Sequence, residues 1–346
     1  MRFTLALAVA LACGIGAVAE AQTELSLLAL GDTGRPSSWP AQLTPQYRVG
    51  EAMAREDRRA PVEAIVFLGD NFYPDGLSRR TLLRRVRENV AGPYCHFLTL
   101  TRLGRRALRD HCSLALAQTH PVPIIAVLGN HDVGRGQGVA LQRAGIPRFV
   151  GNWLTPDGAR SYELGAGVSL VAYDSTAIDA GLPATALARA LAESKGPWRI
   201  LAAHHPIADP GAGWHAEDTA PVLEAIRSSG KLVHLFLAGH QHSLEALRAP
   251  GAALHVVSGG GGAKVRPVTP TPGERLFGEA RYGFARVDAT PDALEVTLLA
   301  LSGPFDRSAE PRARFRIDPD GRVERLDALS APPAAGRAAA RARARR

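Results

Sequence analysis

Short apolar runs alternate with helix-like segments in the first part of the chain. Residues 25–30, 63–68 and 124–128 are largely apolar, and each run is followed by a glycine and then by Asp or Asn. Runs of this kind are typical of strands that are covered on both faces of a sheet. Between them, residues 46–59 and 81–90 have helical spacing. The order strand, helix, strand predicts a βαβ framework.

The alternation continues through a second series of elements. Its expected strands are residues 168–173, 198–203 and 233–238, and its expected helices are residues 182–193 and 220–228. The last third predicts strands with little helix, at residues 254–257, 282–287, 294–301 and 313–317. We therefore expect an α/β fold in which two packed mixed β-sheets are flanked by helices. No interior linker divides the pattern, so residues 22–329 are predicted to form one domain.

The first 21 residues have the pattern of a secretory signal peptide. Arg2 is followed by an apolar stretch at residues 3–12, and Ala19-Glu20-Ala21 is a small-x-small cleavage pattern. The apolar stretch is too short to span a membrane. Cys13 raises the alternative of a lipoprotein, but Ala10 stands where a lipid-attachment signal prefers Leu. We expect export, to the periplasm or to the medium.

The charge distribution and the cysteines narrow the possible classes of protein further. Of the net charge of +8, five units come from arginines in residues 330–346, a stretch rich in Ala, Pro and Arg with no apolar period. We expect this tail to be disordered. The leader is neutral overall, which leaves about +3 on the domain, so no nucleic-acid partner is expected. The mature chain keeps Cys95 and Cys112, either as a disulfide or as two free thiols.

Five motifs place polar side chains directly after strand-like runs. They are Gly31-Asp32-Thr33-Gly34, Gly69-Asp70-Asn71-Phe72-Tyr73, Gly129-Asn130-His131-Asp132, His204-His205-Pro206 and Gly239-His240-Gln241-His242. In an open α/β sheet, ligands gather beyond the carboxyl ends of the strands. Ser175 also follows a strand, but no His/Asp partner pattern supports a serine nucleophile. We expect the five motifs to converge on one crevice.

The residue types in these motifs are those that bind metal ions. Asp32 and Asp70 offer carboxylate oxygens, Asn130 offers an amide oxygen, and the histidines offer imidazole nitrogens. One carboxylate has two oxygens and can bridge two cations. Two such ions about 3.5–4 Å apart can clamp the attacking and leaving oxygens of a displacement at phosphorus. The composition of the motifs therefore predicts a two-metal site.

On these motifs the chain resembles the metallophosphoesterase superfamily, the calcineurin-like phosphatases, and within it the purple acid phosphatase branch. Most of the superfamily has a metal-binding His two residues after the first Asp, where this chain has Gly34. The purple branch instead has a Tyr three residues after the second Asp, which matches Tyr73. The resemblance spans about residues 25 to 265, and it implies the four-layer sandwich of that superfamily.

The resemblance also implies which residues hold the metal ions. The first ion would be held by Asp32, Asp70, Tyr73 and His242. The second ion would be held by Asp70, Asn130, His204 and His240. A tyrosine phenolate favours Fe(III) at the first position, while the ligand types leave Fe(II), Zn(II) and Mn(II) open at the second.

Four further residues have expected roles at this site. His131 resembles the histidine that binds the phosphoryl group or protonates the leaving oxygen, and Asp132 would orient it. His205 occupies the variable place of a His-x-Pro motif, so either it contacts substrate or it packs. His215 lies in a loop where the purple branch often carries a substrate-facing His.

We therefore predict an exported phosphomonoesterase of the acid-phosphatase type that acts on a small phosphate ester. A phosphodiesterase or nucleotidase on the same core is an alternative, because loops decide the substrate. A second alternative is a non-catalytic envelope protein that binds a metal ion or phosphate. The sequence predicts neither the physiological substrate nor the oligomeric state.

Overall fold

The computed structural model of the chain describes residues 25–35, 43–112, 118–134, 136–176, 184–207, 216–268, 274–303 and 305–326. The expected signal peptide with Cys13, the expected tail at 330–346 and His215 lie outside the described residues. Among the described residues, no helix combines the length and apolar character that crossing a membrane requires.

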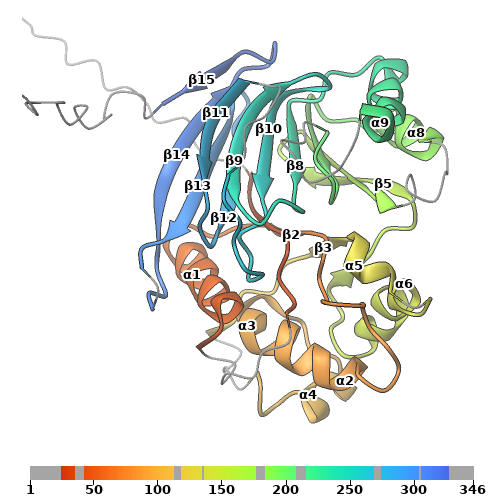
Figure 1. The fold of residues 1–346 in the computed structure, drawn as a ribbon, viewed down its shortest axis with the longest axis vertical. Coiled ribbons are helices and arrows are strands. Elements are labelled where there is room, and N and C mark those ends of the chain that lie inside the picture. Colours follow the sequence, from red (N-terminus) through yellow and green to blue (C-terminus); the bar gives the residue numbers. More distant parts are fainter. Residues whose placement is uncertain are drawn as a thin grey trace, which may run out of the picture.

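Two mixed β-sheets form the centre of the molecule (Figure 1). The first sheet has eight strands, which in spatial order are β15 (Val323–Arg325), β14 (Ala309–Ile317), β13 (Leu294–Leu301), β12 (Gly283–Ala289), β1 (Leu25–Leu30), β2 (Ala64–Leu68), β3 (Ile124–Val127) and β4 (Trp153–Leu154). The second has seven, in the order β11 (Glu274–Glu279), β9 (Leu244–Ala249), β10 (Ala252–Ser258), β8 (Leu235–Ala238), β7 (Trp198–Ala202), β6 (Val168–Tyr173) and β5 (Ala159–Gly165).

The parallel strands form one half of the first sheet, out to its edge strand β4, and the middle of the second sheet. In the first sheet β1, β2, β3 and β4 run parallel, and β12 pairs antiparallel to β1. In the second sheet β6, β7, β8 and β10 run parallel, and β5 and β9 pair antiparallel at either side. The carboxyl ends of the parallel strands in each sheet are therefore at one edge, where the five polar motifs begin.

Helices cover the outer faces of both sheets. They are α1 (Pro45–Arg59), α2 (Leu82–Val86), α3 (Gly92–Tyr94), α4 (Arg102–Ala107), α5 (Asn130–Val133), α6 (Gly138–Ala140), α8 (Thr185–Glu193) and α9 (Ala216–Ser229). The start of α1 is fixed by Thr44, whose hydroxyl accepts from Tyr47 N at 3.3 Å, and by Pro45 in the first turn. Figure 1 shows α8 and α9 together beside the second sheet.

Three apolar clusters correspond to the interfaces between the layers. Leu27 and Val66 of the first sheet pack with Leu170 and Ile200 of the second, all fully buried. A second cluster joins the outer face of the first sheet to α1, and a third joins the second sheet to α8 and α9. The order helix, sheet, sheet, helix confirms the predicted fold class of two packed mixed sheets flanked by helices.

The segment between α3 and β3 is fastened to the body at two points. A disulfide joins Cys95 and Cys112, whose Cα atoms are 5.1 Å apart, so the free-thiol alternative is wrong in this structure. Asp57, on α1, accepts hydrogen bonds from His96 Nε2 at 2.7 Å and from His120 Nδ1 at 2.9 Å. The disulfide and the two hydrogen bonds of Asp57 therefore tie Cys112 to Cys95, and His96 and His120 to α1.

Candidate metal centre

The side chains of the site come from the ends of strands in both sheets. Asp32, Asp70 and Asn130 follow β1, β2 and β3 of the first sheet, while His204 and His240 follow β7 and β8 of the second. Backbone hydrogen bonds tie the loops within each sheet: Asp32 N donates to Gly69 O at 3.0 Å, and Gly239 N donates to His204 O at 3.0 Å. The site is thus built across the junction of the two sheets.

The backbone at this junction is strained at four of the expected ligands. Asp32, Asp70, His240 and His242 have φ angles of 60°, 52°, 71° and 46°. Non-glycine residues adopt this left-handed region at a cost of about 1–3 kcal/mol each, and such residues cluster at functional sites. The surrounding sheets hold these turns in place, with Asp32, Asp70 and His242 in one group of neighbouring ligand atoms and His240 in the other.

The first group of expected ligands is compact and buried. Tyr73 Oη lies 2.9 Å from Asp32 Oδ1 and 2.9 Å from His242 Nε2. His242 Nε2 lies 3.3 Å from the same Asp32 oxygen. Asp32, Asp70 and His242 each place one ligand atom within 4.8 Å of the others. All four side chains are buried.

The side chains of this first group have fewer hydrogen-bond donors than acceptor lone pairs. His242 Nδ1 lies 2.9 Å from Lys264 O, and a carbonyl only accepts, so His242 carries its proton on Nδ1 and a lone pair on Nε2. Tyr73 has a single proton for Asp32 and His242 together. A cation between these three side chains satisfies all the lone pairs, so the donor set fits a metal ion.

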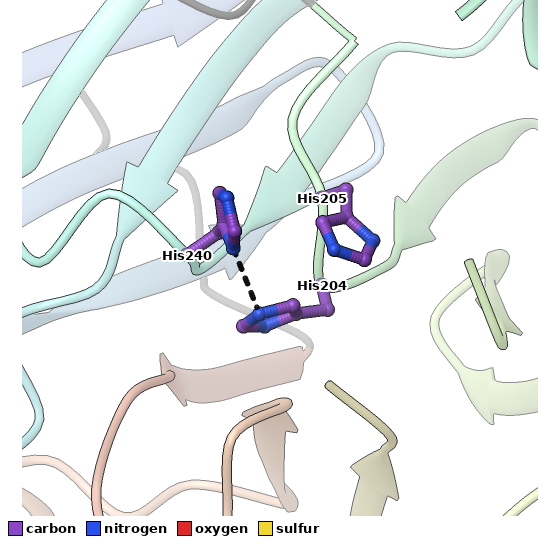
Figure 2. A group of neighbouring side chains, drawn as sticks. All are labelled: His204, His205 and His240. Atoms are coloured by element: carbon purple, nitrogen blue, oxygen red, sulfur yellow. Dashed lines mark hydrogen bonds between the residues drawn. The ribbon is translucent and has the colours of Figure 1, made fainter. Parts of the chain in front are cut away.

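The second group has the same character. His204 Nε2 lies 3.1 Å from Asn130 Oδ1, 3.2 Å from His240 Nδ1 and 3.5 Å from Asp70 Oδ1. Figure 2 shows the His204 and His240 rings meeting at this short contact. His204 Nδ1 lies 2.8 Å from Leu68 O, so it holds the proton and Nε2 has the lone pair. Facing lone pairs again fit a cation.

Electrostatics agree with cation binding in both groups. Burial and the nearby carboxylates of Asp32 and Asp70 raise the pKa of the Tyr73 hydroxyl far above its ordinary value. A phenolate at this place therefore needs a strongly positive neighbour. Burial lowers the pKa of His240 to about 3, so its imidazole is neutral in mild acid and has a lone pair to give.

Gly34 cannot carry the histidine that most of the superfamily has there. A Cβ atom at Gly34 would lie 1.7 Å from Asn71 O. The chain packs tightly here because Tyr73 N donates to Gly34 O at 2.9 Å, which brings the loop with Tyr73 against the loop with Asp32. The close approach that excludes a side chain at Gly34 is thus the same contact that positions Tyr73.

His131 lies at the rim of the site, but Asp132 does not orient it, and that expectation is wrong. His131 Nδ1 donates instead to Pro74 O at 2.6 Å. The fully buried Asp132 accepts from three backbone N–H groups, those of Asn71, Phe72 and Gly129, each at 2.9 Å. Its carboxylate thus satisfies N–H groups in the loops after β2 and β3, which have no partners in a strand or helix.

His205 is buried beside the second group, and Ser175 holds it. His205 Nδ1 lies 2.9 Å from Ser175 Oγ, and the ring centroid lies 4.8 Å from those of His204 and His240. Burial lowers the pKa of His205. The sequence pattern showed Ser175 at a strand end but not its contact with His205, and it showed nothing of the carbonyls of Leu68 and Lys264. Nothing in a sequence marks a carbonyl that sets a tautomer, whereas Ser175 was visible at the end of a strand.

Comparison with known proteins agrees with this geometry. The model of the calcineurin-like phosphoesterase family matches residues 25–244. Purple acid phosphatase 4 of Arabidopsis thaliana is 24% identical over 307 residues, which cover 81% of each chain. Purple acid phosphatase 17 of the same plant is 24% identical over 318 residues, covering 82% of this chain and 83% of the relative.

Solved structures with low identity share the fold. The Plasmodium protein GAP50, the anchor in the inner membrane complex, superposes with a TM-score of 0.60 at 16% identity, covering 84% of this chain and 89% of that one. PhoD superposes with a TM-score of 0.56 at 16% identity, covering 91% and 73%. The family match covers more than half of the chain, and the chain belongs to the calcineurin-like phosphoesterase family of metal-dependent phosphoric ester hydrolases.

Proposed function

We propose that this chain is an exported phosphomonoesterase of the acid-phosphatase type, with two metal ions bridged by Asp70. The observation that carries the proposal is the pair of lone-pair-rich groups on either side of Asp70, which come from both sheets. In the proposal, Asp32, Asp70, Tyr73 and His242 hold one ion. Asp70, Asn130, His204 and His240 hold the other.

When bound, the two ions neutralise charge on the phosphoryl group and lower the pKa of water, which supplies a nucleophile near neutral pH. His131 would then act on the leaving alcohol. Its Nδ1 is engaged by Pro74 O, so Nε2 is the nitrogen that faces a ligand, and it lies 3.9 Å from Asp70 Oδ2. The side chain is 36% exposed, so it can exchange its proton with solvent. Asp132 supports the loop that carries His131 and takes no part in proton transfer.

The identity of each ion and the export of the chain belong to the proposal as well. A Tyr73 phenolate favours Fe(III), and similarity to purple acid phosphatases supports that choice. The second ion is Fe(II), Zn(II) or Mn(II). The expected signal peptide, together with a disulfide between Cys95 and Cys112, supports an oxidising compartment outside the cytoplasm.

Hydrolysis of 4-nitrophenyl phosphate by the purified chain tests the proposal. We expect Asp70→Ala and Asn130→Ala to lower kcat by a factor of about 1,000 or more, because each removes a metal ligand. Asp75→Ala is the matched control: Asp75 is an exposed carboxylate on the same loop as Asp70, and its loss should leave kcat within about twofold. Undiminished activity in both ligand variants, with metal content unchanged, would remove the proposal.

A comparison with bis(4-nitrophenyl) phosphate separates the alternatives. A monoesterase has the higher kcat/KM on the monoester, whereas a diesterase on the same core has it on the diester. GAP50 is called an anchor, and it shares this fold. Metal binding without turnover of either ester would therefore favour the non-catalytic alternative.

A further inference from the structure

Ser175 and His205 form a buried pair next to the proposed second metal position. Ser175 follows β6 and His205 follows β7, so adjacent parallel strands bring them together. Their side chains are buried, with exposed fractions of 1% and 6%. His204, His205 and His240 each offer a ligand atom within 4.8 Å of the others. Figure 2 shows the three imidazoles around one region.

The contacts of Ser175 determine which nitrogen of His205 carries the proton. Ser175 Oγ accepts from His205 N at 3.1 Å and lies 2.9 Å from His205 Nδ1. A hydroxyl has one proton to donate. Because the backbone N–H already donates to this oxygen, the simplest complete pairing has the Ser175 hydroxyl donating to Nδ1. His205 then carries its own proton on Nε2.

This arrangement is the reverse of that at the two histidines assigned as Nε2 ligands. In His204 and His242 the Nδ1 atoms lie against the carbonyls of Leu68 and Lys264, which can only accept. Their Nε2 atoms therefore carry lone pairs and suit a metal ion. At His205 a hydroxyl takes the place of the carbonyl, so Nε2 carries a hydrogen and suits an acceptor. A protonated ring nitrogen cannot ligate a cation.

We propose that His205, with its tautomer set by Ser175, donates a hydrogen bond from Nε2 to a phosphoryl oxygen of the ester at the second metal position. The inference rests on the proposed function, and it assigns His205 to substrate binding rather than to packing or to metal ligation. A tetrahedral oxyanion has the acceptors that such a donor needs, and N–H donors to charged oxygens are about twice as strong as neutral pairs. Ser175 is a positioning residue that acts through His205.

The competing role is a third imidazole on the second metal ion. This role requires His205 to carry its proton on Nδ1 and to donate a hydrogen bond to Ser175 Oγ. The oxygen would then accept two hydrogen bonds, and the Ser175 hydroxyl would have to donate to a different acceptor. The two roles differ in what they predict for metal content. A ligand variant loses metal, whereas a donor variant keeps both ions and loses affinity for the oxyanion.

Calorimetric titration of the metal-loaded protein with inorganic phosphate, together with elemental analysis, tests the inference. We expect His205→Ala to raise the phosphate Kd about tenfold while metal content stays equal to wild type. His205→Gln can place an amide N–H near the same point and should recover part of the affinity. Ser175→Ala should raise Kd about threefold, and Ser175→Thr, which keeps the hydroxyl, should recover it. Thr176→Val removes a neighbouring hydroxyl that donates to Asp174 instead, and it should change nothing.

Three outcomes would overturn the inference. A phosphate Kd in His205→Ala equal to that of wild type would leave His205 as a packing residue. Loss of metal in this variant would make it a ligand. Should His205→Ala fail to fold, the pair Ser175→Ala and Ser175→Thr decides, and equal Kd values in the two would contradict the role of the hydroxyl. A wild-type protein that hydrolyses no ester would contradict the proposed function itself. The results with the His205 and Ser175 variants test only the inference about His205.

Discussion

Asp132 illustrates how much one buried side chain contributes to the site without touching substrate. Its two oxygens hold the backbone N–H groups of Asn71, Phe72 and Gly129. These groups belong to the loops that carry Asp70, Tyr73 and Asn130. The carboxylate therefore fixes the relative positions of ligands on two neighbouring strand ends.

Asp132→Ala should lower the free energy of unfolding by about 3 kcal/mol or more. The substitution leaves three backbone N–H groups without their acceptor, and each unpaired buried group costs about 1–3 kcal/mol unless water replaces the carboxylate. Urea denaturation of the metal-free protein measures the change, with Asp75→Ala as the exposed control. A loss below about 1 kcal/mol would mean that the loops hold their shape without Asp132.

Residue-level prediction from sequence worked where a side chain has a distinctive position. Asp32, Asp70 and Asn130 were singled out because each follows an apolar run and a glycine. The structure groups Asp32 with Asp70, and it places Asn130 Oδ1 3.1 Å from His204 Nε2. The predicted role of Asp132 in orienting His131 was wrong, because adjacency in sequence does not reveal that His131 turns toward Pro74 O. The sequence shows that Gly34 departs from the superfamily pattern, but it does not show the physical cause, which is the close approach of Asn71 O.

At the scale of elements, β10 contains an unusual buried residue. His255 lies inside the strand, is 2% exposed and stacks on Phe236 with ring centroids 5.3 Å apart. Burial lowers its pKa to about 4, since the charged ring would be out of water. An unfolded chain binds a proton at this histidine from about pH 6.5 downward. Acid therefore favours unfolding until the pH passes below the pKa of the folded state.

His255→Phe should reduce this loss of stability in acid. Between pH 7.5 and pH 4.5, we expect the wild-type protein to lose about 2.5 kcal/mol more unfolding free energy than the variant. Urea denaturation of both metal-free proteins at the two pH values measures the difference. The change in unfolding free energy between the two pH values is compared for each protein, so a packing effect of the substitution that is the same at both pH values cancels. Parallel pH dependence in the two proteins would show that His255 titrates normally in the folded state.

Central strands were predictable and several outer ones were not. The runs at β1, β6 and β13 are largely apolar, and the expected bounds match the observed ones. The strand β5 was missed because alternate residues face solvent at the edge of the sheet. In β9, Glu245 interrupts the apolar pattern, although it is buried against Arg275 at 3.0 Å. A buried ion pair places a charged residue within the apolar pattern, so the pattern no longer predicts the strand.

At the scale of the whole molecule, the candidate metal centre lies across the two sheets. Asp32, Asp70 and Asn130 come from the first sheet, and His204, His240 and His242 come from the second. A ligand that binds only the folded state stabilises it in proportion to the logarithm of its concentration over Kd. Metal binding should thus contribute to the cohesion of the sandwich as well as to catalysis.

Removing metal should lower the melting temperature by about 5 °C or more and abolish hydrolysis together. At a free metal concentration near 100 Kd, each ion contributes about 2.7 kcal/mol to the folded state. Calorimetric scans before and after dialysis against a chelator measure the shift, and reloading should restore both properties. In Asp70→Ala, which lacks the carboxylate shared by the two proposed ligand sets, the chelator should have much less effect. An unchanged melting temperature in wild type would place the ions, if any, outside this junction.

The proposed two-metal site with its tyrosine ligand can be tested by the absorption spectrum of the mature protein, recorded with metal analysis for wild type and Tyr73→Phe. We expect two metal ions per chain, at least one of them iron, and a visible band from the tyrosine–iron bond that is absent in Tyr73→Phe. A colourless wild-type protein with two Mn or Zn ions would keep the two-metal site but contradict the ferric assignment. A wild-type protein that binds no metal would contradict the account as a whole.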